Sequence, residues 1–519
     1  MTEPAPDDVF QLGVRQWRDG DDLVLWHPVT GRHVRLHHGT VARLCAHPGD
    51  PRLKPVRDRL DRLHLLRSSP RPPWDALIPC RSRLVLTLPD EAALWLPVPG
   101  FRGPGGYGYR ALQLSPAAHR VWQHINDARP LSEVADRAGV DLLTAQSLCA
   151  LLTTPEVQAL QLRPTPPRPR DLGLERLVDV PRPPNARPPH LTGPAGETTL
   201  TWYHLHGIDD GETHFDDRET TVAHGLGLPH PALGGLRYGA ALRDALTRRG
   251  LVPEGGLLVE VGCGTGELAA AWQEHGPSKL HYLRADLSPE LLRTQARRVP
   301  HGHGILADGT RLPLRDGSVD LLVSNEVIAD LQAVPVDPAA PDSDAAREAL
   351  ALLHAARITP FAGRTWVNLG AFHLVAEIAR VLRPGGAAWL SEFGVLDEPP
   401  QEAVQLDHPE VAIQVDHLAA IARHHGLSVS IEPLAELLGM DLTVQQVSRP
   451  SWEAVRALAH SRGLRLPART WSVEALRAHL PFSVEGLRAV PLTDEGPAPL
   501  VTRFWSWTLR RPKVPAHGD

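Results

Sequence analysis

The chain has 519 residues, more than a single hydrophobic core usually serves, so two to four domains are expected. Its 42% apolar and 22% charged residues are typical of a globular protein. Its net charge of -6 gives no general attraction to nucleic acid or anionic membranes, although this net charge does not exclude a local basic groove. No apolar run reaches the roughly 18 residues of a membrane span, and residues 1–8 do not resemble a signal peptide. We therefore expect a cytoplasmic protein.

Residues 1–70 are expected to form a small α+β module. Short alternating runs at 14–17, 23–26 and 33–36 indicate strands, and helices should follow from Thr40 and over 56–66.

Residues 74–162 repeat that order. Strands are predicted at 83–88 and 93–96, and a helix should begin with Ser115 as N-cap and Pro116 at the first helical position. Two further helices are expected, one beginning near 131 and one over 142–152. A β-ribbon followed by three short helices predicts a winged-helix-like module, present once or twice.

The run from Leu114 to Ile125, followed by Pro130–Ala135, resembles the small peptide-recognition domains of the pyrroloquinoline-quinone peptide chaperone family. This loose resemblance covers about fifty residues and implies that the module recognises a peptide. The alternative is a generic winged helix that serves packing or dimerisation.

Nine prolines fall between Pro164 and Pro189. Because proline fixes φ and removes an amide donor, residues 163–196 are predicted to be a mostly extended linker between the N-terminal and C-terminal regions.

A buried parallel strand is predicted at 257–261, followed by the glycine-rich loop Gly262–Gly266 and a helix. Glycines let such a loop bend sharply and approach a ligand, and the helix N-terminus adds free amides. A dinucleotide frame, G-x-G-x-x-G, would place the acid Glu267 at its last glycine position. The frame E-x-G-x-G-x-G is complete from Glu260 to Gly266.

This second frame resembles that of the class I S-adenosylmethionine-dependent methyltransferases. The resemblance implies that the loop holds the amino-acid end of S-adenosylmethionine and that Glu260 helps to hold its ammonium group through water or the backbone. Asp286 ends the next predicted strand, twenty residues past Gly266, and would accept the ribose hydroxyls. Asp308 would accept the adenine amino group, with Gly309 near the ring. The expected cofactor-binding residues are Glu260, Gly262, Cys263, Gly264, Gly266, Asp286, Leu287, Asp308, Gly309 and Asn325.

Later segments follow the same family in order over about 160 residues. Residues 312–324 resemble its fourth-strand motif, and a helix at 374–382, a stop at Arg383–Gly386 and a strand at 387–392 come next. Sixth and seventh strands are expected near 427–432 and 503–509. Residues 197–512 are thus predicted to be an α/β domain with a Rossmann-like seven-stranded methyltransferase sheet. There are two alternatives. One is a parallel α/β domain without a cofactor, and the other is a domain that binds the cofactor but does not catalyse methyl transfer.

The catalytic candidates are Glu326, Asn325 and Tyr238. Asn325 and Glu326 follow the fourth strand, where they could orient an amine or accept its proton. Alternatively, Asn325 caps a following helix and Glu326 is a solvated first-turn acid. Tyr238, like His224 and His230, lies in the segment that commonly closes over the cofactor in this fold.

No metal site is expected. His224 and His230 lack the spacing of a metal-binding pair on one helix face, and the four cysteines lie far apart without a C-x-x-C pair. Two insertions, at about 331–372 and 441–499, could cover the acceptor site or could be packing elaborations.

The leading hypothesis is a methyltransferase whose N-terminal modules recruit the acceptor, a peptide or protein. One alternative is a small-molecule methyltransferase with an N-terminal dimerisation region, which would make a homodimer. Another is a cofactor-sensing DNA-binding regulator, but residues 141–152 carry no arginine or lysine, which argues against a recognition helix. Neither nucleic acid nor a membrane is an expected partner, and the acceptor atom stays open among N, O and C.

Overall fold

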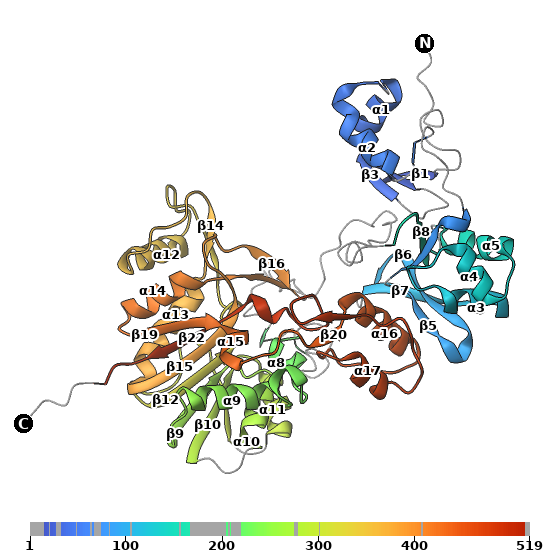
Figure 1. Cartoon of the computed structure of the whole chain (residues 1–519). Helices are drawn as coiled ribbons and strands as arrows, with labels where there is room; N and C mark the ends of the chain where they lie inside the picture. Colours follow the sequence, from blue (N-terminus) through green and yellow to red (C-terminus); the bar gives the residue numbers. More distant parts are fainter. Residues whose placement is uncertain are drawn as a thin grey trace, which may run out of the picture. The chain divides into compact units, whose positions relative to one another are not determined.

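The computed structural model describes residues 15–19, 21–26, 33–47, 49–62, 65–66, 74–82, 84–103, 106–154, 157–166, 204–205, 208, 220–274, 279–299, 302–405 and 408–513. The chain divides into two compact units (Figure 1). The first comprises residues 1–185, 447–466 and 472–489, and the second comprises residues 186–446, 467–471 and 490–519. Most of the predicted linker at 163–196 lies outside the described residues.

The first N-terminal module is an antiparallel sheet followed by helices. Its strands are β1 (Arg15–Asp19), β2 (Asp22–Trp26) and β3 (His33–His37), and α1 (His38–Ala46) and α2 (Lys54–Arg62) come next. Leu25, Leu44 and Leu60 form a core between sheet and helices. The strands and helices predicted for this stretch are confirmed to within a few residues.

The second module contains three strands and three helices in the expected order. The sheet is β5 (Leu86–Leu88), β6 (Ala93–Gly103) and β7 (Gly106–Gln113), and the helices are α3 (Pro116–His124), α4 (Leu131–Ala138) and α5 (Leu142–Leu152). Ser115 caps α3 as predicted, since its side chain accepts from the Ala118 amide. β7 was not predicted, because the glycines and prolines of residues 97–108 hide its pairing with β6.

A short strand pair closes this module, with β4 (Ile78–Arg81) antiparallel to β8 (Leu160–Arg163). The winged-helix assignment stays a prediction.

The insertion predicted at 441–499 does not all belong to the methyltransferase domain. Residues 447–466 and 472–489, with α16 (Arg449–Ser461) and α17 (Val473–His479), fall in the first unit. Thr87 of β5 forms a bridge with Glu485, and α16 contacts β5, β6 and β7. The structural reason is that the insertion returns to cover the β5–β6–β7 sheet.

The second unit is built on a twisted, mostly parallel sheet in the order β11-β10-β9-β12-β15-β22-β19, with β18 (Ile413–Gln414) pairing off β15. Its strands are β9 (Gly255–Val261), β10 (Lys279–Asp286), β11 (His303–Leu306), β12 (Val319–Asn325), β15 (Leu382–Val395), β19 (Ser428–Pro433) and β22 (Phe504–Arg510). β22 runs antiparallel to both β15 and β19. The predicted α/β fold with a Rossmann-like sheet is confirmed.

Helices cover both faces of this sheet (Figure 1). α9 (Tyr238–Arg248) contacts α10 (Glu267–Gln273) and α15 (Leu434–Leu438), while α13 (Leu369–Val381) contacts α14 (Val415–His424). The central strands are buried on both sides, as continuous apolar runs such as Leu321–Val323 predict. All strand C-termini of the parallel part therefore meet at one edge, where ligands bind in this class of sheet.

The first insertion, 331–372, forms β13 (Val334–Val336), α12 (Asp344–Ala355) and β14 (Thr365–Val367). Across the described part of the chain, no helix is long and apolar enough to cross a membrane.

Candidate active site

The glycine-rich loop links β9 to α10 at the C-terminal edge of the sheet. Gly262, Gly264 and Gly266 have φ values of +70°, +48° and +81°, which side-chain-bearing residues rarely adopt. A Cβ on Gly262 would also lie 2.2 Å from Cγ2 of Val327. Glycine is therefore required here by conformation and by space.

Asp286 ends β10 beside this loop. Its Oδ2 accepts from the Gly264 amide at 3.0 Å and its Oδ1 from the Ser288 amide at 2.9 Å. Burial raises the pKa of this carboxyl to about 6, and the backbone donors and the nearby His204 oppose the shift. Since a carboxylate has about four acceptor positions, each oxygen keeps capacity for a further donor, as recognition of a vicinal diol requires.

Asp308 and Gly309 follow β11 and line the same cavity. Asp308 is exposed, and its Oδ1 accepts from both the amide and the hydroxyl of Thr310 at 2.8 Å, which holds the loop. A Cβ on Gly309 would lie 2.7 Å from Cγ1 of Val261, so a larger residue would push this segment away from the sheet.

Glu260 and Cys263 turn partly away from the loop's ligand side. The Glu260 carboxyl accepts from the Tyr282 hydroxyl at 2.8 Å, and burial raises its pKa to about 8. The Cys263 thiol donates to Oε1 of Gln295 at 3.1 Å on α11 (Pro289–Arg298). Cys263 can therefore offer a ligand its backbone rather than its thiol.

These residues line one cavity of about 290 Å³ together with Leu287 and Asn325. Nine of the ten residues predicted to bind the cofactor border it, from strand ends far apart in the sequence, and Gly266 is not among the described lining residues. The glycine cradle, the buried Asp286 carboxylate and the mixed polar and apolar lining fit S-adenosylmethionine. Their individual roles stay predictions.

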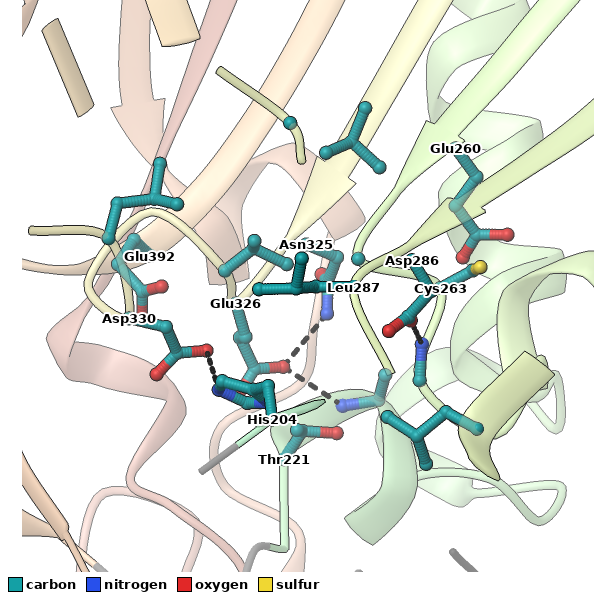
Figure 2. Close-up of a pocket in the computed structure, with 18 of the residues that line it drawn as sticks. His204, Thr221, Glu260, Cys263, Asp286, Leu287, Asn325, Glu326, Asp330 and Glu392 are labelled. Atoms are coloured by element: carbon teal, nitrogen blue, oxygen red, sulfur yellow. Dashed lines mark hydrogen bonds and ion pairs between the residues drawn. The ribbon is translucent and has the colours of Figure 1, made fainter. Parts of the chain in front are cut away.

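Asn325 ends β12 and Glu326 follows it, on the other side of the cavity (Figure 2). Asn325 Nδ2 donates to Glu326 Oε1 at 2.9 Å. The Tyr238 hydroxyl and the Ser391 hydroxyl both lie within hydrogen-bond distance of Asn325 Oδ1, at 2.6 and 2.8 Å. Tyr238 is 1% exposed and is not among the described residues that line the cavity, so it contacts Asn325 rather than a ligand.

Glu326 holds the entry segment against the sheet. Its carboxylate accepts from the Val222 amide at 2.8 Å and the Ala223 amide at 3.3 Å, in the first turn of α8 (Val222–Gly225). Burial raises the Glu326 pKa to about 7 despite these donors. The alternative expectation, a solvated acid on a helix that Asn325 caps, is wrong because no helix directly follows Asn325, Glu326 is partly buried among its hydrogen-bond donors, and Glu326 has a φ of +55°.

Four further acids border the cavity, and sequence reasoning missed them as site residues: Glu267, Asp330, Glu392 and Glu410. Glu392 lies in β15 next to β12, and Asp330 follows the turn after β12, as Figure 2 shows. Glu410 comes from β17 (His408–Val411), which pairs with β16 (Glu402–Gln405). The end of the predicted strand 387–392 was a usable signal for Glu392, but nothing in the sequence pointed to Glu410.

The surroundings of Glu392 raise its pKa. Burial raises the pKa of Glu392 well above its ordinary value, and the charges of Glu410, Asp330 and Glu326 raise it further. The Glu392 carboxyl accepts from two backbone amides, that of Ala329 at 3.3 Å and that of its neighbour Phe393 at 2.9 Å.

The histidines of the entry segment have different places. His224 is buried, lines the cavity and has its Nδ1 3.9 Å from Oε1 of Glu267. His230 accepts from the Ala232 amide and does not border the cavity. His204 also lines it, 3.9 Å from Asp330 (Figure 2). Within the described ranges, no group of three or more His, Cys, Asp or Glu residues could hold a metal ion.

The two insertions contribute little to the cavity wall. Leu331, Gln332 and Gly370 come from the first, and Pro499 comes from the end of the second. Covering of the acceptor site by residues 441–499 stays a prediction.

Comparison with known proteins identifies the part of the chain that contains the glycine-rich loop, Asp286, Asp308 and Glu326. Residues 259–349 match the family model described as a methyltransferase domain. No curated protein matches the chain.

Several solved structures are similar to this chain at low identity. The cyclase SpnF is 15% identical, covers 53% of this chain and 81% of its own, and has a TM-score of 0.29. A TehB-like SAM-dependent methyltransferase from Corynebacterium glutamicum is 18% identical over 40% and 83%, with a TM-score of 0.24. Phospholethanolamine N-methyltransferase 2 of Haemonchus contortus is 13% identical over 59% and 61%, with a TM-score of 0.33. Such scores are too low to bear on the acceptor.

Proposed function

We propose that this protein, an S-adenosylmethionine-dependent methyltransferase, transfers the methyl group to the nitrogen of a cationic amine. The activity and the cofactor rest on the match of residues 259–349 and on the glycine cradle beside Asp286. The proposal that the acceptor is an amine rests on one observation, which is that Glu326, Glu392 and Glu410 all border the cavity.

Electrostatics favours a positively charged occupant. Buried carboxylates are costly unless they are paired, and neighbouring carboxylates raise one another's pKa. Among the described residues that line the cavity, the only side chains able to carry a positive charge are the histidines at 204, 224 and 373. A bound ammonium group would supply counter-charge to the carboxylates and lower the pKa of each of them.

The residues have distinct roles in such a reaction. Asp286 would hold the ribose of S-adenosylmethionine, the glycine loop its amino-acid end, and Asp308 its adenine. The cofactor supplies an electrophilic methyl group, and its carbon–sulfur bond breaks with the electron pair leaving on sulfur. An ammonium group is not nucleophilic, so one N–H bond must break first. Glu326 is placed to accept that proton, because a pKa near 7 suits a general base at neutral pH.

The larger molecule that carries the amine is proposed to be a peptide or protein, recruited by the N-terminal modules. The order of three strands and helices α3, α4 and α5 supports a small recognition module. A small-molecule acceptor with an N-terminal dimerisation region is the alternative. A DNA-binding regulator is less favoured, since α5 has no basic residue and α16 contacts the β5–β6–β7 sheet. The proposed reaction belongs to the EC 2.1.1 class.

The test is a methyl-transfer assay on the full chain with labelled S-adenosylmethionine. The acceptor panel should contain lysine-bearing peptides, N-terminal amines and polyamines, with alcohols and carboxylic acids of matched size. Transfer to amines, with loss of acceptor affinity in Glu392→Gln and unchanged cofactor affinity, is expected. Transfer to oxygen acceptors alone would overturn the amine proposal while leaving the methyltransferase activity standing.

A further inference from the structure

We propose that Tyr238 and Ser391 are positioning residues that fix the Asn325 amide and, through it, the orientation of the Glu326 carboxylate. This inference rests on the proposed function, in which Glu326 accepts a proton from the acceptor. It extends that function by giving a role to two buried residues that do not line the cavity.

The direction of the Asn325 amide follows from hydrogen-bond chemistry. An ionised carboxylate can only accept, so the end of the amide that faces Glu326 must be the NH₂ group. The carbonyl oxygen then faces Tyr238 and Ser391, whose hydroxyls can both donate to it. A flipped amide would set its carbonyl oxygen against the Glu326 carboxylate, which is repulsive.

Burial makes this arrangement rigid. Tyr238 and Ser391 are 1% and 0% exposed, so water does not compete for the Asn325 carbonyl. Burial also raises the pKa of Tyr238 well above its ordinary value. Tyr238 therefore stays a neutral hydroxyl, and its role is to donate a hydrogen bond and not to remove a proton.

These contacts leave the Glu326 carboxylate with one free position at which it can accept a hydrogen bond. Asn325 Nδ2 and the Ala223 amide take Oε1, and the Val222 amide takes Oε2. Of about four acceptor positions, three are used by described residues and the fourth lies on Oε2. The acceptor amine would donate there, and its proton would pass to that oxygen as the N–H bond breaks.

The charged surroundings of Glu326 set the direction of any change in its titration. The titratable groups nearest to it on the packed elements are Glu410 on β17, Glu392 on β15, Tyr238 on α9, His224 on α8, and Asp330 with His204. Glu410 raises the Glu326 pKa, and the Asn325 NH₂ lowers it. Freeing the amide to rotate would weaken the lowering contribution.

The experiment follows the Glu326 carboxyl directly, without turnover. The full chain is labelled with ¹³Cδ-glutamate, and the Glu326 signal is identified by its absence in Glu326→Gln. In Tyr238→Phe and in Ser391→Ala we expect the titration midpoint to rise by about half a unit or more, as loss of one hydrogen bond predicts. Ser391→Thr should restore the native midpoint.

Ser506→Ala is the matched control. Ser506 is 1% exposed and lies opposite Ser391 in the register of β15 and β22, but it donates nothing to Asn325. We expect its Glu326 titration to match that of the native protein. A Glu326 midpoint that stays unchanged in Tyr238→Phe and Ser391→Ala, in folded protein, overturns the positioning role.

Turnover supplies a second and separable readout. For the amine acceptor, kcat should fall about two- to tenfold in Tyr238→Phe, with the acid limb of its pH profile moved upward and the S-adenosylmethionine Kd unchanged. If native protein methylates no amine, the proposed function fails, yet the titration still decides whether Tyr238 and Ser391 act on Glu326. A lower kcat with an unmoved acid limb would count against the proposal.

Discussion

Replacing Gly262 by alanine tests the cofactor loop most directly. Gly262 has a φ of +70°, and an added Cβ would lie 2.2 Å from Cγ2 and 2.9 Å from Cγ1 of Val327. The backbone conformation should cost about 1–2 kcal/mol. Overpacking against Val327 should add about 1–3 kcal/mol.

The two contributions can be separated by choice of variants. Gly250 has a φ of +63° and nothing within 4 Å of an added Cβ, so Gly250→Ala reports the conformational cost alone. The double variant Gly262→Ala/Val327→Ala removes the clash but keeps the strained backbone. A double-mutant cycle should therefore give a favourable coupling of about 1–3 kcal/mol between the two substitutions.

The assays are urea unfolding for stability and calorimetry for S-adenosylmethionine binding. Gly262→Ala should lose about 2–5 kcal/mol of unfolding free energy and bind the cofactor at least tenfold more weakly, since 1.4 kcal/mol corresponds to a factor of ten. Gly250→Ala should bind it normally. If Val327→Ala recovers none of the lost affinity or stability, the clash inferred here is not the cause.

Three further predictions concern charge and packing. Asp286→Ala should weaken S-adenosylmethionine binding by about 1.5–3 kcal/mol, because hydrogen bonds to a charged group are lost, and calorimetry that finds equal affinity would remove Asp286 from the site. The native protein without ligand should lose stability as pH rises from about 5 to 8.5. In the folded state the pKa values of Asp286, Glu326 and Glu260 are about 6, 7 and 8, which lie above those of the unfolded chain, so the folded state binds more protons over this range. A free energy of urea unfolding that does not change with pH would contradict this. Arg488→Ala removes a donor to the Arg81 carbonyl at 3.2 Å and should cost roughly 1 kcal/mol of stability in the first unit without changing cofactor affinity in the same calorimetric assay.

Much of the catalytic unit could be predicted from local sequence. The apolar runs of β9 and β12 indicated buried strands, and the order of Gly262–Gly266, Asp286 and Asp308 along the chain was enough to place them at one sheet edge. The helix caps were equally local, as the bond from the Ala118 amide to Ser115 confirms. These features are readable because a residue's neighbours within a few positions determine them.

The antiparallel elements and the insertion were harder to predict. β7 pairs with β6, but the glycines and prolines of residues 97–108 gave no alternating pattern that predicts it. Two segments interrupt the methyltransferase domain in sequence but pack in the first unit, residues 447–466 and 472–489. Long-range contacts, such as the bridge between Thr87 and Glu485, determine this placement.

The sequence by itself determined the cofactor, the sheet and the edge at which the site lies, because a parallel strand, a left-handed glycine loop and a terminal acid are local patterns. Only the tertiary structure decided which acids meet at the cavity. Glu326, Glu392 and Glu410 come from elements separated by up to 84 positions, and Tyr238 reaches Asn325 from 87 positions away. Their meeting depends on how β12, β15, β17 and α9 pack, and no pattern within any one of those segments carries that information.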